Sequence, residues 1–302
     1  MSDYLKFAEE VSCDIDPVLR AVFDDVSGDD ITVNAGLYSL LAGGKRFRPT
    51  LMYMSADLLG MDRAMVRSYA CALEMIHTYS LIHDDLPGMD NDDLRRGKPT
   101  CHVAFGEGIA VLAGDMLLNR AFEMLTAEII RSDAQQMKNA AVAANRMAYY
   151  SGIRGMLGGQ SIDKSSEGKE LSLDQLAVLQ ELKTGALIEA AITMPYYLRR
   201  GDDQTDLLLQ LKKLAGHIGL AFQIKDDLLD VTSSPEVLGK SIGKDDRDDK
   251  STFVTMLGVT EAKNRLDSEI DGCIAILDTL GKEGYDTYPL RSMIAFIAER
   301  DY

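Results

Sequence analysis

Residues 66–86 read VRSYACALEMIHTYSLIHDDL, and their apolar side chains recur every three or four positions. This spacing is typical of one face of an α-helix, and the run is longer than an ordinary strand. Further runs of the same kind occupy residues 109–130, 134–149, 173–197, 205–231 and 259–280. Pairs of short alternating segments joined by hairpin turns are not found. The sequence therefore predicts an all-α fold.

The segments between these runs are rich in Gly, Pro, Ser and Asp, which predicts loops. The predicted loops span residues 28–30, 87–100, 165–170, 201–205, 233–251 and 281–289. None of them has the composition of an interdomain linker, and no repeat of fixed period is present. We therefore predict a single domain over residues 1–302.

The composition limits the classes of partner. The net charge is −16, which argues against nucleic acid and against an anionic membrane surface as partners. The first residues lack the basic and apolar parts of a signal peptide, and no long uncharged apolar window is present. These features predict a cytoplasmic location without stable membrane association. The four cysteines form no Cys-x-x-Cys pair, which favours reduced thiols over disulfides or a thiolate metal site.

A first acidic cluster follows the opening run, where residues 84–97 read DDLPGMDNDDLRRG. The C-terminus of a helix already carries partial negative charge, so Asp84 and Asp85 are costly there unless a cation binds. Asp84 and Asp90 are separated by ~240° around an ideal helix and cannot share a face. Pro87-Gly88 must therefore bend or end the helix so that Asp90 can return.

A second acidic cluster lies in residues 222–230, which read FQIKDDLLD. Asp226 and Asp230 are one turn apart, separated by only ~40° around the helix, and repel each other unless a cation lies between them. Oxygen-only ligands favour Mg²⁺, which completes its shell with water and substrate phosphates. A solvated acidic surface is the alternative for either cluster alone. Two such clusters, each after an apolar helical run, favour a cation site for an anionic substrate.

Other motifs in the chain are incomplete. Gly239-Lys240-Ser241 resembles the end of a P-loop, but Ser234 stands where the first glycine is required. His83-Asp84 resembles a phosphohydrolase signature, yet such a site needs further histidines and the chain has only four. The basic run Gly43–Pro49, GGKRFRP, is either a solvated loop or an anion site.

Taken together, these motifs resemble the bacterial short-chain isoprenyl (polyprenyl) diphosphate synthases, and most closely the farnesyl diphosphate synthase group. The resemblance extends from about Gly36 to Arg300. Its motifs are GGKRFRP, the block 84–97, Gly158-Gly159-Gln160 with Asp163, Lys183-Thr184-Gly185, the block 222–230, and Gly239-Lys240 with Lys250-Ser251-Thr252. The resemblance implies an isoprenoid-synthase helical bundle around a deep central cavity, with both aspartate motifs at its mouth, and a homodimer.

The resemblance also implies the reaction and the residue roles. Isopentenyl diphosphate would attack the allylic carbocation formed from dimethylallyl or geranyl diphosphate. Roughly three Mg²⁺ ions per active site would assist, held by Asp84, Asp85, Asp90, Asp226, Asp227 and Asp230. The implied residues for isopentenyl diphosphate are Gly44, Lys45, Arg48, His77 and Arg96. Those for the allylic diphosphate and its cation are Arg95, Lys183, Thr184, Gln223, Lys240 and Lys250.

Product length is predicted from Tyr79, five residues before Asp84 and ~7.5 Å from it along the helix axis. With the small Ser80 beside it, a ring there would form the floor of the apolar pocket, which in this family implies a farnesyl product. Geranyl and geranylgeranyl products are alternatives, as are a non-catalytic subunit and a terpene cyclase. The chain departs from many relatives at Phe253-Val254 and in its weakly basic tail, residues 299–302.

Overall fold

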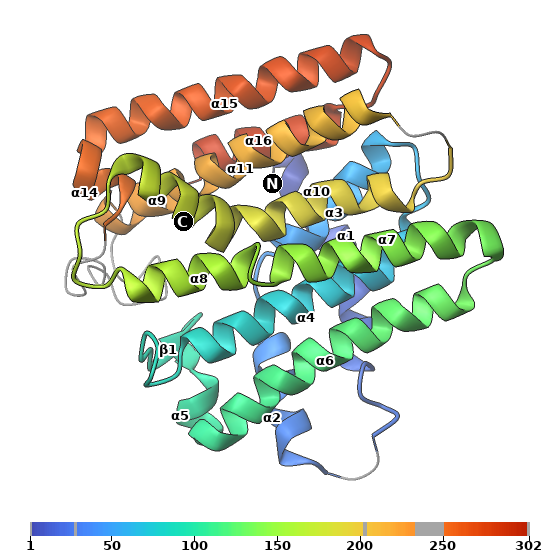
Figure 1. Ribbon diagram of the computed structural model, residues 1–302, viewed down its shortest axis with the longest axis vertical. Coiled ribbons are helices and arrows are strands. Elements are labelled where there is room, and N and C mark those ends of the chain that lie inside the picture. The colour runs from blue at the N-terminus through green and yellow to red at the C-terminus, as the bar shows by residue number, and fades with distance from the viewer. Residues whose placement is uncertain (1, 27–28, 202–203, 233–250, 301–302) are drawn as a thin grey trace.

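The computed structural model describes residues 2–26, 29–201, 204–232 and 251–300 (Figure 1). The prediction of an all-α fold is confirmed. The first helices are α1 (Asp3–Arg20), α2 (Ile31–Leu40), α3 (Phe47–Leu58), η1 (Arg63–Met65), α4 (Arg67–Asp84), α5 (Cys101–Phe105), α6 (Glu107–Arg131) and α7 (Ala134–Ser151). They are followed by α8 (Met156–Ser165), α9 (Leu173–Gln180), η2 (Glu181–Gly185), α10 (Ala186–Leu198), α11 (Thr205–Thr232), α14 (Phe253–Leu257), α15 (Val259–Lys282) and α16 (Tyr288–Glu299).

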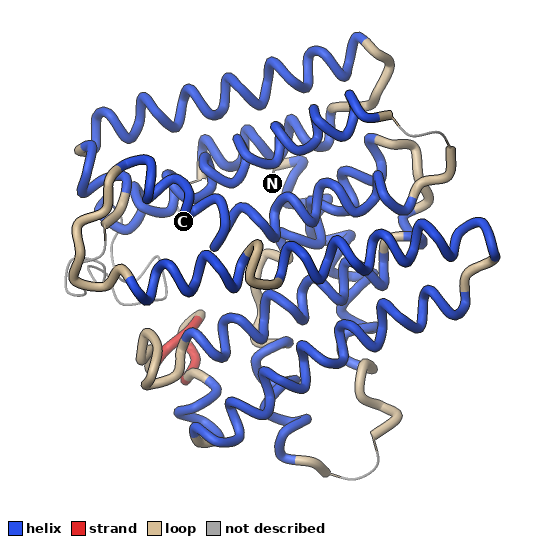
Figure 2. Tube along the Cα trace, in the orientation of Figure 1, coloured by secondary structure: helices blue, strands red, loops and turns tan. Residues whose placement is uncertain are grey.

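The helices form a bundle in which the long elements run roughly alongside one another (Figures 1 and 2). Helix α4 lies near its centre and packs against α6 and α3, while α11 packs against α15 and α10. Every residue of α4 from 69 to 76, about two turns, is buried. A helix that is apolar all round belongs in a core, which explains why residues 66–86 contain so many apolar side chains. None of the described helices is long and apolar enough to span a membrane.

The helix boundaries agree with the periodic runs to within about two residues, with one exception. The run at 173–197 is divided into α9, the π-helix η2 and α10. A π-turn widens the helix locally and is found most often at functional sites. Its residues are Glu181, Leu182, Lys183, Thr184 and Gly185. The sequence prediction treated residues 173–197 as one continuous run and therefore missed this segment.

A small hairpin interrupts the helices after α4. Strand β1 (Leu94–Arg95) pairs antiparallel with β2 (Lys98–Pro99), and Arg95 lies opposite Lys98 (Figure 2). The two turn residues, Arg96 and Gly97, both have positive φ, 55° and 72°, as two-residue hairpin turns require. Strands of two residues show no alternation, so the sequence predicted only a loop here.

Candidate active site

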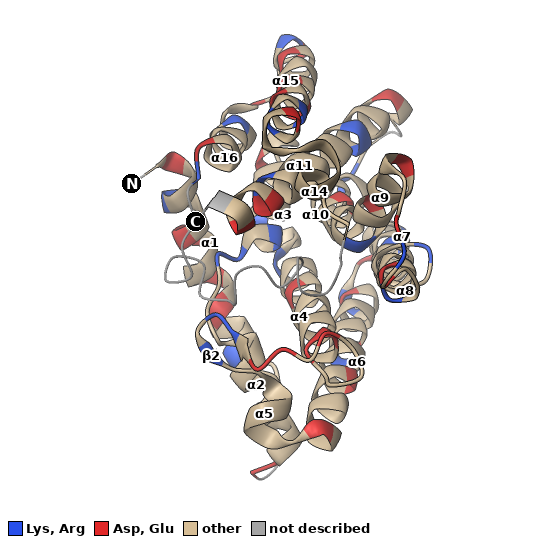
Figure 3. Ribbon diagram, turned by 90° about the vertical axis from the view of Figure 1, so that its left-hand side faces the viewer, with Lys and Arg blue, Asp and Glu red and all other residues tan. Residues whose placement is uncertain are grey.

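Both aspartate clusters lie at the same end of the bundle. Helices α4 and α11 run in the same direction and both end toward the left-hand side of Figure 1, which is the side that faces the viewer in Figure 3. Each cluster therefore brings its carboxylates to a helix end where the backbone already adds negative charge. The clusters are separated by 130 or more residues in sequence, from Asp90 to Asp226, and only the fold brings them to one end.

The first cluster is folded back on itself. Helix α4 ends at Asp84, and the backbone N–H of Asp90 donates to the carbonyl of Asp84 at 2.9 Å. The N–H of Asp92 likewise donates to the carbonyl of Asp85 at 3.2 Å. The predicted end of the helix near Pro87-Gly88, with the return of Asp90, is thus confirmed. These bonds also satisfy carbonyls that a helix C-terminus would otherwise leave without partners.

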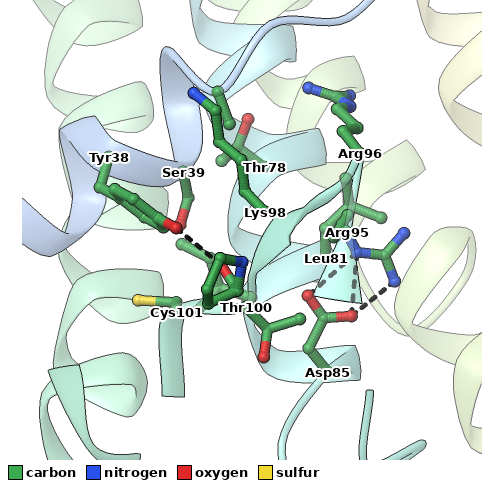
Figure 4. Close-up of a pocket in the computed structure, with 13 residues that line it drawn as sticks. Tyr38, Ser39, Thr78, Leu81, Asp85, Arg95, Arg96, Lys98, Thr100 and Cys101 are labelled. Carbon is green, nitrogen blue, oxygen red and sulfur yellow. Dashed lines mark hydrogen bonds and ion pairs between the residues drawn. The ribbon is translucent and has the colours of Figure 1, made fainter. Parts of the chain in front are cut away.

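Asp85 is held by the hairpin. Its side chain is buried, and Arg95 grips both carboxylate oxygens through Nε at 2.9 Å (Figure 4). Burial raises the pKa of Asp85, and the neighbouring guanidinium opposes that shift. Burial alone would lower the pKa of Arg95, but the hydrogen bonds and charge of Asp85 outweigh it and raise that pKa. Asp85 and Arg95 therefore form a charged pair that ties β1 to the end of α4.

Asp84 faces helix α8 and the π-helix. The amide of Gln160 donates to its carboxylate, and Nζ of Lys183 lies 4.0 Å from it. Lys183 in turn donates to Asp163 at 2.5 Å. Gln160 and Asp163 were recognised as part of a sequence motif but were assigned no role. Their place in the motif indicated a role in the site, since Gln160 contacts Asp84 and Asp163 contacts Lys183.

The second cluster is held by the tail and by helix α14. Arg300 donates to the carboxylate of Asp226 and to the carbonyl of Phe222, with its guanidinium 4.3 Å from the centroid of that ring. Asp227 is buried and accepts bonds from the backbone N–H of Phe253 at 2.9 Å and from Gln223 at 2.8 Å. Sequence analysis missed Arg300, because its partner lies 74 residues away.

The six predicted metal ligands therefore divide into two kinds. Asp85 and Asp227, the second residue of each motif, are buried at 3% and 5% exposure and bonded to protein donors. The remaining four are partly exposed: Asp84, Asp90, Asp226 and Asp230. Carboxylates of this kind suit Mg²⁺, which binds through one or two carboxylates and completes its shell from water and phosphate. In the described part of the chain, no three His, Cys, Asp or Glu side chains come close enough to hold a metal by themselves.

Close backbone packing brings Thr184 and Lys183 to this end. A Cβ on Gly159 would lie 2.2 Å from the backbone nitrogen of Lys183, so only glycine lets α8 approach η2 this closely. The hydroxyl of Thr184 donates to the side-chain oxygen of Gln223 at 3.1 Å. The prediction placed Lys183, Thr184 and Gln223 in one group, and the structure brings them together.

A basic group faces the aspartates. Arg48 contacts Nε2 of His77 at 3.2 Å, and burial lowers the pKa of Arg48 to about 10. Burial, followed by the charges of Arg48 and Arg96, lowers the pKa of His77 well below its usual range. The imidazole is therefore neutral near pH 7 and can accept a hydrogen bond from Arg48. Nε of Arg48 is buried without a hydrogen-bond partner among the described residues, which leaves a donor for a ligand.

The glycine loop completes this group. The guanidinium of Arg96 donates to the carbonyl of Gly43. A Cβ on Gly44 would lie 2.6 Å from Cζ of Arg96. Gly44 also has φ of 127°, a conformation that side chains disfavour. Lys45 is exposed, with Nζ 5.4 Å from the ring centroid of Phe296. The predicted residues Gly44, Lys45, Arg48, His77 and Arg96 thus lie in one region, whereas Lys240 and Lys250 lie outside the described residues.

A cavity of about 450 Å³ lies between α4, α6, α8 and η2. Its polar lining comprises Arg48, His77, Asp84, Gln160, Lys183 and Thr184, together with Ser80 and His83. Its more apolar lining comprises Tyr79, Leu81, Leu86, Met89, Val111, Met156 and Leu157. Tyr79 is buried, and its ring meets His83 edge to face at 5.8 Å. The cavity can hold a molecule with an anionic head and an apolar tail.

Comparison with known proteins agrees with this geometry. The family model described as "Polyprenyl synthetase" matches residues 30–279. The farnesyl diphosphate synthase of Escherichia coli (strain K12) is 42% identical over 264 residues, 87% of each chain. That of Geobacillus stearothermophilus is 38% identical over 98% of each. A chloroplastic "Heterodimeric geranylgeranyl pyrophosphate synthase large subunit 1" of Arabidopsis thaliana is 44% identical over 87% of this chain and 70% of that protein.

Solved structures are similar over almost the whole chain. An apo FPP/GFPP synthase from Zymomonas mobilis has a TM-score of 0.82 and 36% identity, covering 98% of this chain and 99% of that one. A geranyltransferase from Helicobacter pylori, complexed with magnesium and isoprenyl diphosphate, has a TM-score of 0.80 and 32% identity, covering 98% and 96%.

Proposed function

The chain belongs to the polyprenyl synthetase family, and on that premise we propose that it joins isopentenyl diphosphate head to tail to an allylic diphosphate, giving farnesyl diphosphate. The observation that carries this proposal is one cavity with an apolar lining and a mouth where acidic and basic side chains meet. A diphosphate ester with a hydrocarbon tail fits both. The proposal takes residues 1–302 as one synthase domain.

The reaction breaks the C–O bond of the allylic diphosphate and forms a C–C bond from the double bond of isopentenyl diphosphate. The cation formed by this attack then loses a proton to the released diphosphate, which creates the double bond of the new allylic product. Breaking the C–O bond needs positive charge where the leaving diphosphate gains negative charge. Lys183 and Arg95 lie beside Asp84 and Asp85 and are proposed to bind that diphosphate. Lys240 and Lys250 are proposed for the same role.

Magnesium fits the aspartate side of the site. The donors are carboxylate oxygens only, four of them are partly exposed, and the described residues offer no complete protein cage. We propose Asp84, Asp90, Asp226 and Asp230 as ligands, with roughly three ions per loaded site. A bound Mg²⁺ would act as a Lewis acid on diphosphate oxygens. The buried Asp85 and Asp227 are proposed to hold Arg95, Gln223 and α14 in place.

The basic side is proposed to bind isopentenyl diphosphate without metal. Lys45, Arg48 and Arg96 supply positive charge, and neutral His77 orients Arg48. Arginine suits this role because its planar fork binds phosphate oxygens in pairs. The side chains of Thr184 and Gln223 offer oriented dipoles near the polar end of the cavity and are proposed to stabilise the carbocation.

Product length is proposed to depend on Tyr79 and on the small Ser80 beside it. Tyr79 is 7% exposed and lines the cavity, which supports its role as a floor. Relatives named geranylgeranyl synthases reach 48% identity, over 74% of this chain, so a twenty-carbon product is the second candidate. We also propose a homodimer, for which exposed Val111 and Leu112 on α6 supply apolar surface. The predicted cytoplasmic location remains a prediction.

The test is an assay with radiolabelled isopentenyl diphosphate, Mg²⁺ and either dimethylallyl or geranyl diphosphate, with products sized by chromatography. Farnesyl diphosphate as the end product supports the proposal. A twenty-carbon product keeps the chemistry and rejects the role of Tyr79. No condensation with either starter contradicts the proposed activity and would favour a non-catalytic subunit or a cyclase.

A further inference from the structure

One basic side chain of the run Lys45–Arg48 turns away from the cavity. Arg46 is buried at 4% exposure, and its NH1 donates to Oε1 of Glu74 at 2.8 Å. The same guanidinium donates to Asp16 on α1 and to the carbonyl of Leu40 on α2, both at 3.0 Å. Glu74 is itself buried at 3% exposure on α4. Arg46 thus ties the loop before α3 to three other helices.

The backbone of Arg46 is as unusual as its side chain. It has φ 45° and ψ 39°, the left-handed conformation that non-glycine residues rarely adopt. Its carbonyl accepts the N–H of Thr50 at 2.9 Å and the hydroxyl of Thr50 at 2.8 Å, so helix α3 begins there. A strained conformation persists only where surrounding contacts determine it. The buried bonds of the guanidinium are those contacts.

Glu74 lies three residues before His77, on nearly the same face of α4. The Arg46–Glu74 pair in the core and the Arg48–His77 contact at the cavity therefore join the same two segments. Burial lowers the pKa of Arg48, and the charge of Glu74 is the largest of the effects that raise it. Glu74 is thus both the structural partner of Arg46 and a buried counter-charge for this group.

We infer that Arg46 and Glu74 are positioning residues for the basic subsite. They touch no substrate; they fix the turn at which Lys45 leaves the loop and α3 presents Arg48 to His77. The inference rests on the proposed function, because that function assigns the subsite the diphosphate of isopentenyl diphosphate. The cationic side chains of this loop need to be held in place, because they repel each other and would otherwise spread apart.

Two roles for Glu74 predict opposite results in Glu74→Gln. If Glu74 only offset positive charge, its removal would leave the subsite more positive, and diphosphate would bind as tightly or more tightly. If it positions Arg46, the loop relaxes and binding weakens. A displacement of about 1 Å can cost on the order of 10²-fold. The sign of the change therefore separates positioning from simple charge balance.

The experiment measures two quantities on purified full-length protein. Calorimetry with inorganic pyrophosphate in EDTA reports the basic subsite, because without metal the aspartates repel the anion. Steady-state kinetics give KM for isopentenyl diphosphate and for geranyl diphosphate. In Glu74→Gln we expect the Kd for pyrophosphate and the KM for isopentenyl diphosphate to rise about tenfold or more, with kcat and the other KM nearly unchanged.

The matched control is Glu269→Gln. Glu269 is buried at 4% exposure on α15 and pairs with Arg265 and His217 at 2.7 Å each, away from the loop before α3. It should lower thermal stability as Glu74→Gln does without moving either binding constant. Equal effects of the two variants on KM would overturn the inference, because they would reflect general loss of stability.

A second variant keeps the test valid if Glu74→Gln does not fold. Arg46→Gly accepts the left-handed backbone without strain but removes the guanidinium. It should weaken pyrophosphate binding as Glu74→Gln does, and wild-type binding in Arg46→Gly would overturn the inference. If the wild type binds pyrophosphate and both variants bind it weakly, yet no condensation occurs, the proposed function fails and the inference stands.

Discussion

The acidic and basic sides of the cavity mouth are built in different ways. On the basic side, Arg48 and His77 contact each other directly, and Arg46 is fixed in the core by Glu74. On the acidic side, the carboxylates of Asp84 and Asp226 are held by protein donors from α8 and the tail. The basic side is therefore assembled before any ligand arrives. In the proposed function, the acidic side would exchange these protein partners for magnesium and diphosphate.

The difference fits the roles proposed for the two sides. A site that only holds a diphosphate benefits from fixed donors, because rigid groups lose little entropy on binding. A site where a C–O bond breaks needs interactions that strengthen as charge develops. Carboxylates with weak or replaceable protein partners can accept metal and phosphate together at that moment. Substitutions on the acidic side should therefore lower kcat, whereas substitutions on the basic side should raise KM for isopentenyl diphosphate.

The largest effect is expected from Asp84→Asn. The amide can still accept a hydrogen bond from Gln160, so folding should survive, but the charge that holds a cation is lost. We expect kcat to fall by about 10³-fold with little change in KM for isopentenyl diphosphate. Steady-state kinetics with a magnesium titration measure this. The control is Asp278→Asn, a carboxylate on α15 with 54% of its side chain exposed that pairs with Arg291 and does not line the cavity; a comparable loss there would break the comparison.

Arg48→Ala should have the next largest effect, on the opposite quantity. The variant removes the guanidinium that contacts His77 and whose Nε has no hydrogen-bond partner among the described residues. We expect KM for isopentenyl diphosphate to rise by about 10²-fold, with KM for geranyl diphosphate nearly unchanged. Initial rates over both substrate ranges check this. A rise confined to the allylic substrate would mean that the two sides have been assigned the wrong way round.

Helices α4 and α11, which carry His77 and the aspartates, could be predicted from sequence, because a 3.6-residue period survives in their long runs. Helix α3, which carries Arg48, was not among the predicted runs. The return of Asp90 could also be predicted, since Asp84 and Asp90 cannot share a helix face and Pro87-Gly88 offers the break. The division of the aspartates into buried and partly exposed ones could not. Asp84 and Asp85 are neighbours of the same type, and only the distant Arg95 and Gln160 distinguish them.

The partners that decide the site's chemistry are non-local. Arg300 meets Asp226 across 74 residues, and Gln160 meets Asp84 across 76. Arg46 looked like any other member of a basic loop, yet it is buried, whereas Lys45 beside it is exposed. No periodic pattern distinguishes side chains within a four-residue run at a helix start. Such contacts depend on packing, which a sequence pattern does not encode locally.

A smaller effect, on stability, is expected from the neutral histidine. The pKa of His77 is lowered by burial and by Arg48, so the unfolded chain binds a proton below pH 6.5 that the folded chain does not. The free energy of unfolding should therefore fall as pH drops below 6.5, by up to about 1.4 kcal/mol per unit from this group. In His77→Gln that part should vanish. Urea denaturation of both proteins at pH 7.5 and 5.5 measures it. The same change in unfolding free energy between the two pH values in wild type and variant would contradict a neutral His77.

The smallest effect on rate is expected from Tyr79→Ala. This variant tests a residue that lies between the basic side and the acidic side of the cavity mouth. Tyr79 lies on α4 between His77 and Asp84 and lines the cavity, where we propose that it meets the tail of the substrate and not its diphosphate. Removing the ring should let the growing chain reach further toward Val111 and Leu157, so longer products should appear while kcat and both KM values stay within the same order of magnitude. Tyr79→Phe keeps the ring and should keep the wild-type product. Unchanged product length in Tyr79→Ala would place the floor elsewhere in the cavity, whereas a collapse in rate would mean that the tail pocket and the reacting end are not separable.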